Sequence, residues 1–222
     1  MESPQNIKKR LKLANSNELT PPSMLNEKIK SLESGVLVNS QMESKKENNF
    51  AYIDGANLYK GVISSGWNID FKKFRKWLFD KYHVSRAYYF IGMIPEQKFL
   101  YAALQKAGFT LIFKEVIYEA NGKPKGNCDA DLVLQSAIDA FENNCDKQIL
   151  VSSDGDYSSL IKFLILKEKI KIILSPRTSK ECSILLKRTN APITYLQDIK
   201  NKIEFIKEKA PNGDGTPPGS SS

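Results

Sequence analysis

Short apolar runs alternate along the chain with longer segments in which apolar residues recur every three or four positions. A short continuous or alternating run indicates a strand, whereas a period near 3.6 indicates a helix. The turn-forming residues 55–62 (GANLYKGV), which follow the first run, predict a turn. The strand candidates are residues 50–54, 85–92, 109–118, 147–153, 170–175 and 193–196, the third long enough to continue into a hairpin arm. The helix candidates are residues 69–82, 95–108, 129–144, 156–168, 180–189 and 196–209.

This alternation of strands and helices predicts the fold class. Strands linked through helices form right-handed crossovers, which build a parallel sheet covered by helices on both faces. We therefore expect an α/β fold with a mostly parallel sheet of five to six strands. Ligands of such sheets bind at the carboxyl ends of the strands, near the switch in strand order. Polar residues at those ends are the candidates for function.

The alternating pattern is confined to residues 49–209, which we expect to form one domain. Residues 1–48 have little apolar periodicity and are rich in Ser, Asn, Lys, Glu and Pro, so we expect a disordered tail. Residues 210–222, rich in Pro, Gly and Ser, predict a second disordered tail.

Charge and hydropathy narrow the class of protein. The chain has 33 basic and 25 acidic residues, a net charge of +8 that is compatible with a polyanionic partner. No apolar stretch approaches the roughly 20 uninterrupted residues that a membrane span needs. The amino terminus also lacks the apolar segment of a secretory signal. We expect a cytoplasmic protein with no membrane partner.

Cysteine and histidine usage excludes several kinds of site. Cys128, Cys145 and Cys182 form no CxxC pair, and without a secretion signal they are expected to be reduced thiols. His83 is the only histidine, so a multi-histidine metal site is excluded. A Ser-His-Asp hydrolase would depend on this one residue, which lies at a predicted helix end.

Aspartates gather where predicted strands end and where one predicted helix begins. Asp54 ends the first strand, and Asp154 and Asp156 flank a glycine after the strand at 147–153. Asp129 and Asp131 open the helix that leads into that strand, so they belong to the same edge of the sheet. Each residue alone could instead cap a helix or respond to its dipole.

Five carboxylates on one edge repel one another unless a cation compensates their charge. All-oxygen ligation suits Mg²⁺ or Mn²⁺ rather than zinc. Such an ion can activate water for attack on a phosphodiester and stabilise the leaving oxygen without a histidine base. The pattern therefore favours a metal-dependent phosphodiester hydrolase over a set of unrelated helix caps.

Three sequence motifs resemble the NYN domains of the PIN-like nuclease superfamily, in the LabA-like group. They are DGANL, KGNCDADLVL and VSSDGDYSSLI, and the resemblance covers roughly residues 49–200. It implies a Rossmann-like three-layer sandwich of the PIN-like type and a metal-dependent ribonuclease site. The family's acidic residues fall on Asp54, Asp129, Asp154 and Asp156, with Asn57 beside the first.

The chain departs from the family pattern at one position. Many relatives carry a further aspartate six residues after the one at Asp129, and Gln135 stands there in this chain. Asp131 lies one helical turn before Gln135 on the same face and could replace it as a ligand. If it does not, a second metal binds weakly, and activity is low or absent.

Several side chains near the acidic positions are candidates for substrate binding. Lys123 and Lys125 precede the acidic helix, and Arg177 follows a strand end, although solvated loops explain these basic residues equally well. Asn57 and Ser153 flank the predicted site. Tyr59 and Trp67 can stack on bases, but packing in the core is preferred for both. The three groups of candidates are the proposed catalytic residues Asp54, Asp129, Asp154 and Asp156; the metal ligands Asp54, Asp129, Asp131, Asp154 and Asp156; and the substrate contacts Asn57, Lys123, Lys125, Ser153 and Arg177.

The leading hypothesis is a divalent-metal-dependent endoribonuclease that cuts single-stranded or structured RNA, with Mg²⁺ or Mn²⁺ as cofactor. The main alternative is a catalytically weak NYN-fold module with an RNA-binding or regulatory function. A phosphatase for small molecules is a more distant alternative, without a motif that favours it. The sequence allows a homodimer but has no feature that requires one.

Overall fold

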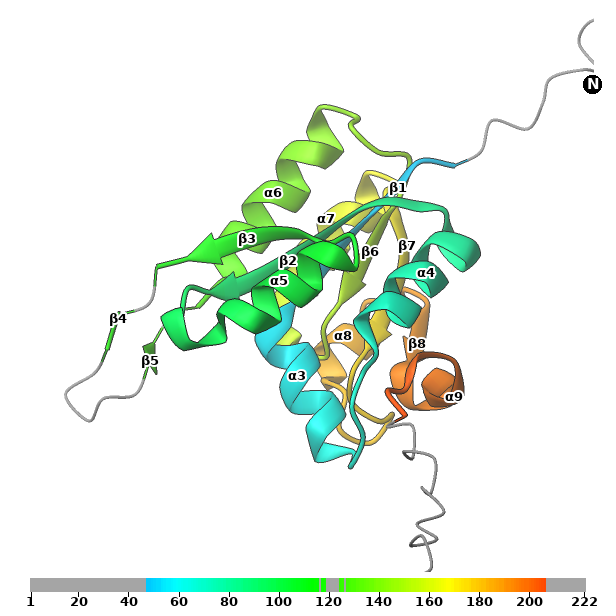
Figure 1. The fold of residues 1–222 in the computed structure, drawn as a ribbon. Helices are drawn as coiled ribbons and strands as arrows, with labels where there is room; N and C mark the ends of the chain where they lie inside the picture. Colours follow the sequence, from blue (N-terminus) through cyan, green and yellow to red (C-terminus); the bar gives the residue numbers. More distant parts are fainter. Residues whose placement is uncertain (1–46, 116, 119–123, 126, 207–222) are drawn as a thin grey trace, which may run out of the picture. The chain divides into compact units, whose positions relative to one another are not determined.

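The computed structural model describes residues 47–115, 117–118, 124–125 and 127–206. The two expected tails lie outside the described residues, except for positions 47 and 48, and so does Lys123. Of Lys125 the structure describes the backbone, within a short strand. Helix and strand labels below are those of Figure 1.

Six parallel strands form the central sheet, in the order β3-β2-β1-β6-β7-β8. This confirms the predicted α/β class with five to six strands. A separate antiparallel pair, β4 with β5, forms the arm expected after the third strand. The strands are β1 (Asn49–Asp54), β2 (Val84–Gly92), β3 (Thr110–Lys114), β4 (Ile117–Tyr118), β5 (Pro124–Lys125), β6 (Gln148–Val151), β7 (Ile170–Ser175) and β8 (Ile193–Tyr195).

Helices cover both faces of the sheet and complete three layers (Figure 1). Within the described residues, no helix is long and apolar enough to cross a membrane. The α-helices are α3 (Gly55–Ser64), α4 (Phe71–Tyr82), α5 (Lys98–Lys106), α6 (Asp129–Phe141), α7 (Ser158–Leu166), α8 (Ile184–Lys187) and α9 (Lys200–Ile203). Short 3₁₀ turns are η1 (Pro95–Gln97), η2 (Gly155–Tyr157) and η3 (Leu196–Ile199).

Strand β1 shows why both faces are covered, since all six of its residues are buried. Ala51 and Ile53 pack with α3, α4, α5 and α9 in one core. Phe50 and Tyr52 point to the other face and pack with α6, α7 and α8 in a second core. Side chains alternate between the faces of a strand, so the middle of a strand between two helical layers, residues 50–53 here, is apolar on both faces.

The prediction of a turn at residues 55–62 is wrong, because this segment is the helix α3. Asp54 caps it by accepting a hydrogen bond at Oδ1 from the backbone N–H of Asn57, at 2.9 Å. Leu58 and Val62, four residues apart, are buried against the sheet. The glycine at 61 suggests a turn, but a Cβ there would approach Pro176 to 2.6 Å, so tight packing requires it.

The helices near the carboxyl terminus are shorter than predicted. The helix expected at 180–189 is reduced to α8, which Ser183 caps by accepting from the N–H of Leu185. The helix expected at 196–209 ends at Ile203 within the described residues. The chain there leaves helical geometry because the residues that follow pair with the segment before α4, where the N–H of Phe205 donates to the carbonyl of Asn68.

Candidate active site

The switch in strand order lies between β1 and β6, which are neighbours in the sheet. From this point the chain adds β2 and β3 on one side and β7 and β8 on the other. Helices leave these two strands in opposite directions, so a crevice forms at their carboxyl ends. Asp54 ends β1, and Asp154 follows the end of β6 by three residues.

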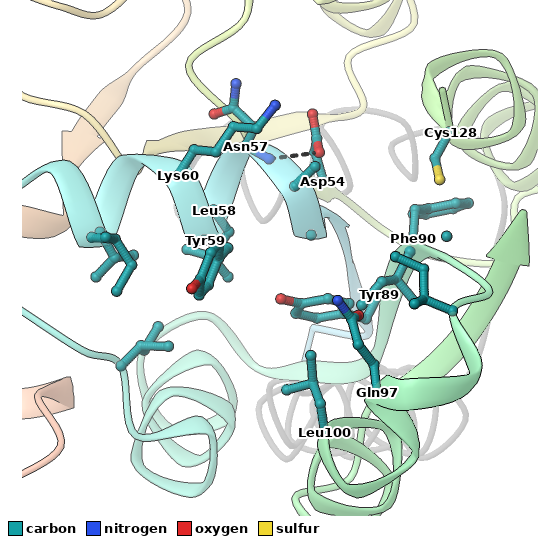
Figure 2. A pocket seen from close by; sticks show the side chains of 18 of the residues that line it. Asp54, Asn57, Leu58, Tyr59, Lys60, Tyr89, Phe90, Gln97, Leu100 and Cys128 are labelled. Carbon is teal, nitrogen blue, oxygen red and sulfur yellow. Dashed lines mark hydrogen bonds between the residues drawn. The ribbon is translucent and has the colours of Figure 1, made fainter. Parts of the chain in front are cut away.

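A cavity of about 690 Å³ opens at this crevice (Figure 2). Its lining includes three of the predicted acids, Asp54, Asp129 and Asp154, together with Asn57. Asp129 is the first residue of α6, and its carboxylate is oriented by Asn127, whose amide donates to Oδ2 at 2.8 Å. The structure thus brings together carboxylates that are far apart in the sequence.

Asp54 is the most buried of these acids, at 8% exposure. Burial raises the pKa of its carboxyl group above the ordinary value, and the hydrogen bond from the Asn57 backbone partly offsets this. The negative charges of Asp129 and Asp154 raise this pKa further. A carboxylate is costly to ionise in such surroundings, and a bound cation would reverse that cost.

Tyr157 lies between two of the acids, a role that the sequence analysis did not assign. Its hydroxyl contacts Asp54 Oδ2 at 3.2 Å and Asp129 Oδ1 at 2.5 Å. A phenol has one hydrogen to donate, so it cannot serve both carboxylates at once. Burial first, and then the charge of Asp54, raises the pKa of Tyr157 well above its usual range, so the hydroxyl stays protonated. The available signal was its place three residues after Asp154, at the start of a helix.

Asn57 and Ser153 join the two strand ends. Asn57 Oδ1 accepts from the backbone N–H of Ser153 at 2.9 Å and from its hydroxyl at 2.8 Å. Ser153 is buried, so in this structure it orients Asn57 and fixes α3 to the segment after β6. The Asn57 amide nitrogen has no hydrogen-bond partner among the described residues and remains a donor for a ligand.

Two predicted ligands lie outside the cavity lining. Asp131 forms an ion pair with Lys114 at the end of β3, with 2.9 Å between Nζ and Oδ2. Asp156 is exposed, and its backbone N–H donates to Asp154 Oδ1 at 3.1 Å. Gln135 donates to Asp139 at 3.1 Å.

One basic residue of the cavity lining, Lys60, was missed because its segment was expected to be a turn. Lys60 lies three residues after Asn57 on α3, so the two share a face of the helix. Arg177 does not line the cavity, and its guanidinium lies 3.9 Å from Glu181.

The donor set of the cavity fits an oxygen-preferring divalent ion in its chemistry. Three carboxylates line it, and the nearby thiol of Cys128 is a poor ligand because burial, above all, raises its pKa to about 11. In the arrangement seen here, no three acidic, cysteine or histidine side chains of the described residues are grouped closely enough to hold one ion. Tyr157 occupies the space between two of the carboxylates instead.

Comparison with known proteins gives one family and one related fold. The family described as the NYN domain matches residues 51–194, well over half of the chain. A solved structure of a protein of unknown function from Vibrio parahaemolyticus is similar with a TM-score of 0.59 and 23% sequence identity. The match covers 74% of this chain and 100% of that one, and at this identity it shows the fold alone. None of the curated proteins compared matches the chain.

Proposed function

The chain belongs to the NYN domain family, part of a nuclease-like superfamily, and from this membership we propose that it is a divalent-metal-dependent endoribonuclease. The observation that carries the proposal is the cavity at the switch in strand order. There the buried carboxyl group of Asp54 faces Asp129 and Asp154, and their charges disfavour its ionisation unless a cation is bound.

In this proposal Asp54, Asp129 and Asp154 hold Mg²⁺ or Mn²⁺. The ion, when bound, supplies Lewis-acid stabilisation of the phosphoryl oxygens and activation of water. Tyr157 donates its one hydroxyl hydrogen to either Asp129 or Asp54 and so orients one of the two carboxylates at a time. Asp156 is proposed as a further ligand, whereas Asp131 would first have to leave Lys114.

The chain's own groups also position the nucleic acid strand. Lys60 and Asn57, whose amide nitrogen has no hydrogen-bond partner among the described residues, line the cavity together with the acids, and we assign them to the phosphate next to the scissile bond. Lys123, Lys125 and Arg177 are proposed as more distant phosphate contacts. The net charge of +8 supports this assignment, because binding of a polyanion by lysines and arginines releases counterions and weakens as salt rises.

The test is cleavage of end-labelled single-stranded and hairpin RNA in Mn²⁺ or Mg²⁺ by the full chain, compared with Asp154→Asn. Asparagine can still cap η2 as Asp154 does, so the fold is expected to survive. Asp80→Asn, which alters an exposed aspartate paired with Lys76, is the matched control. Metal-dependent cutting that Asp154→Asn abolishes and Asp80→Asn retains supports the proposal, and equal cutting by all three proteins points to a contaminant.

A binding module without strong catalysis is the second candidate, favoured by two observations. The position at which many relatives carry a further acid holds Gln135, which bonds to Asp139 rather than facing the cavity. Asp131, its potential replacement, is paired with Lys114. RNA that is bound in EDTA and remains uncut in Mn²⁺ would establish the binding module and overturn the enzyme.

A further inference from the structure

The cavity extends beyond the carboxylates into a cleft that the proposed chemistry does not use. The cleft lies between α3 on one side and η1 with α5 on the other, and the segment before α4 closes it (Figure 2). We call it the side cleft. Six residues define it: Tyr59, Ile63, Asn68, Tyr89, Gln97 and Leu100.

The walls of the side cleft are apolar and partly aromatic. Tyr59 is 64% exposed, although it is a large ring that would gain free energy from burial. Ile63, one turn further along α3, is 44% exposed, and Leu100 lies on α5. A flat apolar ligand that entered here would cover these side chains from two sides.

Polar groups lie at the inner end of the side cleft. Tyr89 is only 2% exposed, and its hydroxyl has no hydrogen-bond partner among the described residues. The hydroxyl oxygen itself is not among the described polar atoms that are buried without a partner, so it is open to water or to a ligand in the cavity. The Tyr89 side chain lines the cavity together with the amide of Gln97 (Figure 2). A ligand with donors and acceptors along its edge would satisfy both groups.

Close packing fixes Tyr89 beside the acids. A Cβ at position 55 would approach Tyr89 Cε1 to 2.4 Å, so only glycine there lets the ring lie against the start of α3. Gly55 follows Asp54 directly, and the side cleft is therefore continuous with the carboxylates within one cavity. A ligand in the side cleft would therefore lie in the same cavity as the carboxylates of the proposed cleavage site.

We propose that the side cleft binds one unpaired nucleobase of the RNA strand, adjacent to the scissile phosphate. The assignment of this ligand as a base of RNA rests on the proposed function. A nucleobase has two apolar faces and a polar edge, which match Tyr59 and Leu100 at the walls and Tyr89 and Gln97 at the inner end. A base in a duplex has its faces stacked and its edge paired, so the cleft selects single-stranded segments.

The test is fluorescence anisotropy of a labelled single-stranded RNA, and of the same RNA in a duplex, with the full chain in EDTA. Leu100→Trp fills the cleft, and Tyr89→Phe removes only the hydroxyl. Phe99→Trp is the control, because Phe99 is 79% exposed on the same helix and does not line the cavity. Circular dichroism confirms that each variant is folded.

We expect Leu100→Trp to weaken single-strand binding by about tenfold, the scale of losing one stacked base. Tyr89→Phe is expected to weaken it about threefold, while duplex binding and the Phe99→Trp control stay unchanged. If Leu100→Trp and Tyr89→Phe are folded and bind single strands as tightly as the wild type, the side cleft is not a base site. An equal loss of duplex binding would also overturn the proposal.

These outcomes separate the side cleft from the proposed nuclease activity. Cleavage that depends on Asp154, with single-strand binding unaffected by Leu100→Trp and Tyr89→Phe, retains the nuclease and removes the base site. Single-strand binding that these variants weaken, in a protein that never cuts RNA, retains the base site and removes the nuclease.

Discussion

Two buried aspartates, each in contact with a tyrosine hydroxyl, differ in everything else around them. Asp139 on α6 is 2% exposed and accepts from the Tyr52 hydroxyl at 2.7 Å and from Gln135 at 3.1 Å, both at Oδ2. Asn144 donates to its other oxygen at 2.9 Å. Asp54 accepts one backbone N–H and shares a hydroxyl with Asp129.

The hydrogen-bond donors and charges around each carboxyl group distinguish a structural acid, Asp139, from a candidate cation ligand, Asp54. Three side-chain donors replace the water that Asp139 loses on burial, so both of its carboxyl oxygens have hydrogen-bond partners within the protein. Asp54 instead faces the charges of Asp129 and Asp154, which raise its pKa beyond the effect of burial. A tyrosine contact alone therefore does not distinguish the two roles, whereas the balance of donors and neighbouring charges does.

The largest effect is expected from Asp54→Asn in the cleavage assay. We expect about a thousandfold loss of activity, equivalent to about 4 kcal/mol in activation free energy, because the cavity loses a metal ligand. In EDTA the free energy of unfolding should not fall, since asparagine still caps α3 and one repulsive charge is gone. Urea denaturation provides the second measurement, and a marked destabilisation would assign Asp54 the structural role.

Asp139→Leu should give the opposite result. Removal of the acceptor leaves the buried Tyr52 hydroxyl and the half-buried Gln135 amide without this partner, whereas the exposed Asn144 keeps Glu142, and the loss is about 3 kcal/mol of stability by urea denaturation. Cleavage measured well below the unfolding midpoint should remain near the wild-type rate. A folded Asp139→Leu protein without activity would show that the contrast between the two acids is mistaken.

Metal binding should distinguish the two regions by thermal unfolding, without any activity assay. Mn²⁺ at a hundredfold excess over its dissociation constant is expected to stabilise the wild type by about 2.7 kcal/mol. Asp54→Asn and Asp129→Asn should lose most of this gain, because both remove cavity carboxylates, whereas Tyr52→Phe should keep it. An undiminished gain in the two cavity variants would place the ion elsewhere.

The smallest effects concern the two tyrosines. Tyr52→Phe is expected to lower the free energy of unfolding by about 1 kcal/mol whether or not Mn²⁺ is present, because its partner Asp139 lies outside the cavity. Tyr157→Phe should lower the free energy of unfolding by about 2 kcal/mol in EDTA, because the Tyr157 hydroxyl bonds to the carboxyl groups of Asp54 and Asp129. The loss should be smaller in Mn²⁺, because the bound ion compensates the repulsion between these groups. Equal metal dependence of both losses in urea denaturation would contradict this difference.

Much of the fold was predictable because strands and helices have their own periods in sequence. The apolar strand of residues 50–54 and the amphipathic helix that starts after Asp70 both follow from short-range patterns. Helix α3 was missed because two of its glycines, Gly55 and Gly61, imitate a turn. Each is required by close packing, against Tyr89 and Pro176, and those contacts are with residues distant in the sequence.

The residues of the candidate site likewise include some that local sequence patterns predicted and others that depend on contacts between distant residues. The motif order along the chain, with the rule that parallel strands end at one edge, was enough to associate Asp54, Asp129 and Asp154. Whether a carboxylate lines the cavity or pairs with a lysine depends on a side-chain direction, and Asp131 with Lys114 could not be foreseen. Tyr157 was missed for the same reason, whereas Lys60 was missed because its helix was expected to be a turn.

The sequence by itself determined the α/β class, the strand ends at which acids gather and the family, because hydrophobic period and motif spacing are local properties. Only the tertiary structure decided that Tyr157 lies between two carboxylates and that Asp139 is satisfied by three donors. It also decided that the side cleft joins the acidic cavity. These features depend on contacts between residues far apart in the chain, and such contacts exist only once the layers have packed.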